Sequence, residues 1–170
     1  MSPKILIAGI GNIFLGDDAF GVDTSRALLQ RGLPEGVKVV DYGIRGFDLA
    51  YALLGDWDAV ILVDALGRGG APGTLYLLEP DLSSAKNPQP EHLAMNPHGM
   101  DPVHVIQLAF SLGEVSARIY LVGCEPEDFG DELEGRMSLS NTVQASIGGA
   151  IAMIENLVEQ ILAPARACTL

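Results

Sequence analysis

The chain has 170 residues, of which 48% are hydrophobic, and this length and composition suit one globular domain with a core of ordinary size. Ten Lys and Arg against 22 Asp and Glu give a formal charge of −12, which argues against nucleic acid or an anionic membrane as partner. Cys124 and Cys168 are too few and too far apart for a disulfide framework or a cysteine zinc motif, so we expect a reducing cytoplasm. We expect neither a signal peptide nor a membrane span.

Strand and helix patterns alternate along the chain. Helical spacing of apolar residues and the usual stop signals predict four helices, at 18–31, 47–54, 102–112 and from Ser140 or Asn141 to about 161. Asp101 is the expected N-cap of the third helix, and Pro102 its first residue. Short apolar runs predict five strands, at 5–8, 37–41, 59–64, 74–78 and 118–122.

The connection after the third predicted strand fixes the direction of the fourth. Only nine residues separate Asp64 from Thr74, and a parallel crossover needs a dozen or more, so the fourth strand should run antiparallel. We therefore predict an α/β fold: a single-domain three-layer sandwich, with a five-stranded, mostly parallel twisted sheet, one antiparallel strand and helices on both faces. Residues 1–163 should form the domain, with a long loop at 79–100 and a frayed tail at 164–170.

The loop after the first strand offers carboxylates where a nucleotide-binding loop would offer a phosphate cradle. It begins with Gly9-Ile10-Gly11-Asn12, half of the dinucleotide fingerprint, but the third glycine position holds Phe14. Asp17 and Asp18 would place negative charge where a pyrophosphate must lie. We expect one of these two acids to cap the following helix, which leaves the other free to act.

Acidic residues lie at the ends of the first three predicted strands, and a histidine lies in the long loop. In a parallel sheet, Asp18, Asp41 and Asp64 would share one edge, while His98 precedes a helix. Two carboxylates and one imidazole suit a borderline divalent ion such as zinc or nickel, with positions left open for water or substrate. Taken singly, each residue also has a simpler interpretation as a cap, a strand-end residue or a loop histidine.

The order of these motifs resembles one family over nearly the whole chain. Besides the first loop with Gly21-Val22, the matching segments are Asp41 with Gly43 and Gly46, Val63-Asp64-Ala65 with Ala71-Pro72-Gly73-Thr74, Pro97-His98, and Leu121-Val122-Gly123 with Pro126-Glu127. The chain resembles the hydrogenase maturation proteases, endopeptidases that remove the C-terminal extension of the nickel-iron hydrogenase large subunit. The resemblance implies a nickel-loaded precursor as partner and substrate. We expect the protein to act in the cytoplasm as a monomer.

The resemblance also implies which residues form the site. A three-residue metal site maps to Asp18, Asp64 and His98, and members of the family carry Glu or Asp at the first of these positions. Asp41 matches a catalytic position near the site, with a role in positioning the substrate or moving a proton. His104 is a second choice for the histidine, because only His98 follows proline in the motif. Nickel would come with the substrate, and zinc or another divalent ion could occupy the site in isolation.

The other common protease signatures are missing from the sequence. It contains no His-Glu-x-x-His and no Gly-x-Ser-x-Gly, and we interpret Cys124 as a small buried residue. A checkpoint chaperone that grips the nickel-loaded subunit without cutting it would need the same three residues. A nucleotide-binding α/β domain and a spore-type peptidase are weaker alternatives.

Overall fold

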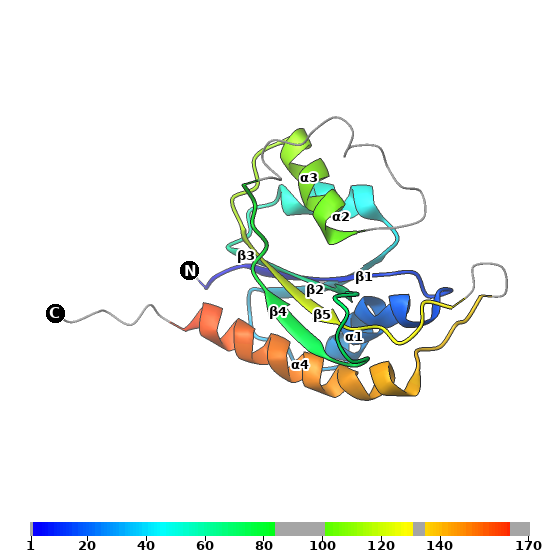
Figure 1. The fold of residues 1–170 in the computed structure, drawn as a ribbon. Coiled ribbons are helices and arrows are strands. Elements are labelled where there is room, and N and C mark those ends of the chain that lie inside the picture. Colours follow the sequence, from blue (N-terminus) through cyan, green and yellow to red (C-terminus); the bar gives the residue numbers. More distant parts are fainter. Residues whose placement is uncertain (1, 84–100, 131–134, 164–170) are drawn as a thin grey trace.

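A five-stranded mixed sheet forms the centre of the computed structural model, which describes residues 2–83, 101–130 and 135–163 (Figure 1). The strands are β1 (Ile5–Ile10), β2 (Val37–Gly43), β3 (Ala59–Ala65), β4 (Leu75–Leu78) and β5 (Arg118–Cys124). The helices are the 3-10 turn η1 (Gly16–Ala19), α1 (Phe20–Leu29), α2 (Gly46–Leu53), α3 (Pro102–Leu112) and α4 (Asn141–Leu162).

The strand order is β2-β1-β3-β5-β4, with β4 antiparallel to β5 and every other pair parallel. This arrangement confirms the predicted sheet, including the reversed fourth strand. The central strands β1 and β3 are buried along their whole length, because helices cover both faces of the sheet. Their carboxyl ends therefore lie in the middle of one edge, where open α/β sheets bind ligands.

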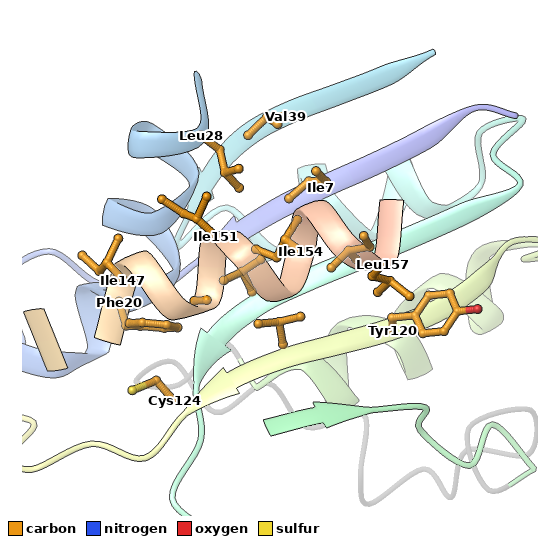
Figure 2. Close-up of a cluster of buried hydrophobic side chains, with 14 of the residues drawn as sticks. Ile7, Phe20, Leu28, Val39, Tyr120, Cys124, Ile147, Ile151, Ile154 and Leu157 are labelled. Carbon is orange, nitrogen blue, oxygen red and sulfur yellow. The ribbon is translucent and has the colours of Figure 1, made fainter. Parts of the chain in front are cut away.

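Two apolar cores lie on opposite faces of the sheet, as the alternation of side chains along a strand requires. Helices α1 and α4 cover one face, and α2 and α3 cover the other (Figure 1). Figure 2 shows the first core, in which Ile151, Ile154 and Leu157 of α4 pack on the sheet beside Phe20 and Leu28 of α1. The molecule is thus the predicted three-layer sandwich.

The element boundaries differ little from the predicted ones. Strands β1, β2 and β5 each extend two residues further, and the first helix begins as a 3-10 turn. The Asp101 side chain caps α3 by accepting from Val103 N at 2.8 Å, and the Ser140 side chain caps α4. The expected capping role of Asp17 or Asp18 is wrong, because no side chain caps η1 or α1 and both carboxylates bind elsewhere.

Three sequence predictions concern residues outside the described ranges. His98, most of the long loop and the predicted tail at 164–170 lie outside the described residues. Among the described helices, none combines the length and the apolar character needed to cross a bilayer.

Candidate active site at the carboxyl edge of the sheet

Glycines at the end of β1 allow α1 to touch the backbones of two strands. A Cβ on Gly21 of α1 would collide with the carbonyl oxygens of Val63 and Ile10, and one on Gly9 would collide with Ser25. Only glycine permits so close an approach. The glycine-rich sequence therefore serves helix packing, and it brings the turn that carries Asp18 against the edge of the sheet.

The N–H groups of this loop are already used inside the protein. Gly11 N donates to Gly43 O at 3.1 Å, Asn12 N to the Asp18 carboxylate at 2.7 Å, and Phe14 N to the Asn12 side chain at 3.0 Å. A phosphate site needs such donors free and turned outward. The geometry therefore gives the nucleotide-binding alternative no support.

Asp18 stands at this edge as a half-buried carboxylate. Burial raises its pKa, and the hydrogen bond from Asn12 N only partly opposes that effect. One of its oxygens, Oδ2, accepts from Asn12, and no protein donor to Oδ1 is recorded among the described residues. Asp18 can thus be held in place through one oxygen while it offers the other to a ligand.

Asp64 lies in β3 next to this position and is 5% exposed. Side chains alternate along a strand, so it shares its face with Val60 and Leu62, on the side covered by α2 and α3. Burial raises its pKa well above the ordinary value, and the negative charge of Asp18 raises it further. The N–H of Ala65, which donates to Asp64 Oδ1 at 2.8 Å, opposes the rise.

A buried carboxyl whose ionisation is opposed both by burial and by a neighbouring carboxylate is favoured by a bound cation. Within 2–83, 101–130 and 135–163, however, no group of three or more His, Cys, Asp or Glu is arranged to hold a metal. The predicted third ligand, His98, is outside those ranges. Asp101 also acts electrostatically on Asp64 and raises its pKa slightly further.

The remaining candidates are placed differently. Asp41 shares a face with Val39, under α1 and α4, and so lies on the opposite side of the sheet from Asp64. Its carboxylate pairs with Arg26 of α1 at 3.0 Å. His104 is on the exposed first turn of α3, with Nδ1 3.6 Å from the Asp101 carboxylate. The structure thus brings Asp18 and Asp64 together and separates Asp41 from them.

Cys124, at the end of β5, is fully buried, as predicted for a small apolar residue. Burial raises the pKa of its thiol, which keeps it protonated and a poor nucleophile.

Comparisons with known proteins agree with this architecture. The HycI model, described as hydrogenase maturation protease, matches residues 22–157. The hydrogenase 2 maturation protease of Escherichia coli (strain K12) is 36% identical over 172 residues, which cover 96% of this chain and 91% of that protein. The chain belongs to the hydrogenase maturation protease family.

Solved structures of the family share the fold. The hydrogenase maturating endopeptidase HybD of E. coli superimposes with a TM-score of 0.68 at 30% identity, over 92% of this chain and 93% of that one. The maturation protease HycI of Thermococcus kodakarensis KOD1 gives a TM-score of 0.66 at 25% identity, over 95% and 93%. These matches establish the chain as a maturation protease, and hence a hydrolase.

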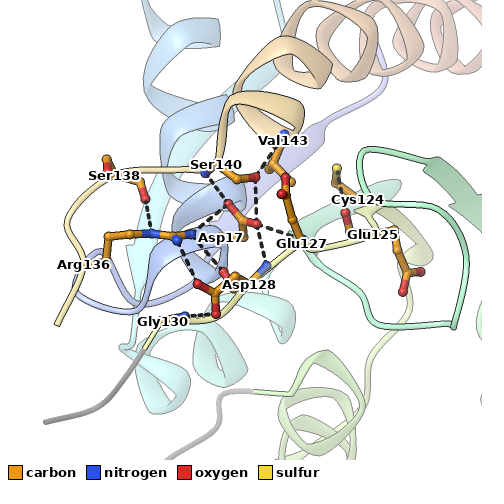
Figure 3. A network of polar contacts seen from close by, with 10 residues as sticks. All are labelled: Asp17, Cys124, Glu125, Glu127, Asp128, Gly130, Arg136, Ser138, Ser140 and Val143. Carbon is orange, nitrogen blue, oxygen red and sulfur yellow. Dashed lines mark hydrogen bonds and ion pairs between the residues drawn. The ribbon is translucent and has the colours of Figure 1, made fainter. Parts of the chain in front are cut away.

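Two buried carboxylates of this maturation protease were missed as anchors by sequence analysis. Asp17 accepts hydrogen bonds from residues around 127 and 140 (Figure 3), and Glu125 accepts from Arg68 N, Gly69 N and the Tyr76 hydroxyl. The hydrogen bond from Arg68 N is the largest cause that lowers the pKa of Glu125. The adjacent acids Asp17 and Asp18 indicated only that one of the two could have a role other than ligand binding, and nothing local in the sequence indicated the contacts of Glu125.

Proposed function

We propose that this protein is the endopeptidase that removes the C-terminal extension from the nickel-loaded precursor of a nickel-iron hydrogenase large subunit. It recognises the bound nickel through Asp18, Asp64 and His98, and works in the cytoplasm as a monomer. The observation that carries the proposal is the buried Asp64 beside the half-buried Asp18 at the carboxyl edge of the sheet. Burial raises the pKa of both carboxyls, and the charge of Asp18 raises that of Asp64 further. The family supplies the reaction type, and the acid pair supplies ligands for a cation.

The nickel is part of the substrate, so the enzyme needs only ligands of its own. Asp18 and Asp64 would contribute oxygen and His98 nitrogen, which suits a borderline divalent ion. Open positions on that ion could polarise the scissile carbonyl or activate water. In the isolated protein, zinc or another divalent ion could occupy the same position.

Asp41 has a less direct role in this proposal. Its carboxylate pairs with Arg26, and its carbonyl oxygen accepts from the Arg45 guanidinium at the start of the next loop. We propose that Asp41 positions the end of β2 and the loop that follows it; the last residue of β2, Gly43, accepts a hydrogen bond from Gly11 N through its carbonyl oxygen. It would act on the substrate only through that loop.

Cleavage of purified precursor tests the proposal. Nickel-loaded precursor should lose its C-terminal peptide on incubation with this protein, while nickel-free precursor stays intact. Because imidazole and carboxylate ligands recognise the metal, Asp18→Asn and His98→Ala proteins should leave both forms uncut. Mass spectrometry of the large subunit reads out the product directly.

Two other outcomes would have distinct meanings. A protein that binds nickel-loaded precursor tightly and never cuts it would be the checkpoint chaperone. Cleavage that ignores nickel, or that survives loss of both ligands, would contradict the proposed recognition while leaving the family membership intact.

A further inference from the structure

Asp17 is a fully buried carboxylate on the loop that carries Asp18. Its oxygens accept from Glu127 N at 2.8 Å, Asp128 N at 3.0 Å, Ser140 N at 2.6 Å and the Ser140 hydroxyl at 2.9 Å (Figure 3). The Arg136 guanidinium stands 3.7 Å away. One side chain thus joins the exit loop of β1 to the exit loop of β5 and to the N-cap of α4.

The main chain around Asp17 is hydrogen-bonded to the same segments. Asp17 N donates to Asp128 O at 3.0 Å, and Gly16 N donates to Arg136 O at 2.8 Å. The turn before Asp18 is therefore fixed through both its backbone and a side chain. Since consecutive Cα atoms are about 3.8 Å apart across a rigid peptide plane, a displaced Asp17 would displace Asp18 as well.

We propose that Asp17 is a positioning residue, whose buried carboxylate sets the place from which Asp18 engages the substrate's nickel. This inference rests on the proposed function. Asp17 touches neither metal nor scissile bond in this account, and it acts only through its neighbour in the chain. Its role is comparable to that of the outer partners which orient metal ligands in other proteins.

The contacts require a carboxylate at this position. The N–H groups of Glu127, Asp128 and Ser140 and the Ser140 hydroxyl all donate to its two buried oxygens. Every recorded partner is a donor, and an ionised carboxylate is an acceptor only. Asparagine keeps the size but turns an NH₂ group toward some of these donors, so Asp17→Asn should release the loop.

Asp17→Asn is the test variant, with Ile154→Ala as the control for stability. Ile154 is fully buried in α4, fourteen residues beyond Ser140 and so about 20 Å along the helix. Its truncation destabilises the core without touching the loop. Both variants are assayed at a temperature at which thermal unfolding curves show them folded. The readouts are kcat/KM on nickel-loaded precursor and the affinity for Ni²⁺ alone by calorimetry.

We expect Asp17→Asn to lower kcat/KM about 10- to 100-fold and to weaken Ni²⁺ binding, the scale for partners that orient ligands. Ile154→Ala should stay within about two-fold of the wild type, since only stability is lost. Ser140→Ala removes one donor to Asp17 together with the side-chain cap of α4, and should fall between them. Ser140→Thr, which keeps the hydroxyl for both contacts, should restore activity. The serine variants decide the question if Asp17→Asn does not fold.

If folded Asp17→Asn protein cleaves like the wild type while Asp18→Asn protein is inactive, the positioning role of Asp17 is overturned and the proposed function stands. If Ser140→Ala also matched the wild type, Asp17 would have a structural role only. Asp18→Asn protein that cleaves like the wild type would overturn the proposed function, and the assignment with it.

Discussion

Replacing Asp64 with asparagine is expected to lower kcat/KM on nickel-loaded precursor at least about a hundred-fold. Partners that merely orient metal ligands cost up to about that much, and a direct ligand should cost no less. Asparagine fills the same space but lacks the negative charge with which Asp64, together with Asp18, would bind the cation. Single-turnover cleavage followed by mass spectrometry measures the loss. Activity within a few-fold of the wild type would remove Asp64 from the site.

The same variant should unfold less readily than the wild type at pH 7. Burial and the charge of Asp18 raise the pKa of Asp64, so the folded chain is penalised when this group ionises. Asparagine removes that penalty, and we expect the free energy of unfolding to rise by roughly 1–3 kcal/mol, the cost of a poorly satisfied buried polar group. Urea unfolding of both proteins measures the difference.

The pH dependence of this gain has a definite sign. Below the unfolded-state pKa of about 3.9, Asp64 is protonated in both the folded and the unfolded chain, so its ionisation does not lower the stability. As the pH rises from there through the raised pKa of the folded protein, the wild type loses stability relative to Asp64→Asn. The advantage of the variant should therefore appear above about pH 4 and grow toward neutrality. An advantage that is constant from pH 3 to pH 7 would contradict the raised pKa.

Replacing Gly21 with alanine should destabilise the fold severely. In an ordinary helix interior, alanine is favoured over glycine by about 1 kcal/mol. Here a Cβ would collide with the backbone oxygens of Val63 and Ile10, which cannot rotate away as a side chain would. Overpacking typically costs about 1–3 kcal/mol, and this clash with two strands should reach or exceed the upper end. Chemical denaturation measures the change.

Gly148→Ala is the matched control, because a Cβ there meets nothing within 4 Å. Gly148 lies in α4, and alanine should stabilise that helix by about 0.5–1 kcal/mol. The two identical substitutions are thus expected to change stability in opposite directions. Equal effects at both positions would mean that α1 does not touch the strands as described.

The fold was predictable because its signals are local. Continuous apolar runs identified the buried strands β1 and β3, and the short connection from Asp64 to Thr74 fixed the direction of β4. Asp18 and Asp64 could be placed at one edge because the first follows and the second ends a strand of a sheet predicted to be parallel at those positions. Their electrostatic coupling agrees with that placement.

Register and long-range contacts were not predictable. Asp41 and Val63 are both cross-strand partners of Gly9, so their side chains face the same side of the sheet. Asp64 follows Val63 in β3 and therefore faces the opposite side. A shift of one residue in pairing would reverse that face, and no local pattern fixes the pairing. The contacts of Asp17 join residues 110 to 123 positions apart, and adjacent acids alone cannot reveal them.

The central claim, that this protein contacts the substrate's nickel, can be tested on the metal itself. X-ray absorption at the nickel edge is recorded for loaded precursor alone and for precursor freeze-quenched on mixing with the protein. Added oxygen and nitrogen ligands are predicted on mixing, with the nitrogen lost in His98→Ala and an oxygen lost in Asp18→Asn. A nickel environment that is the same with and without the protein would contradict the account.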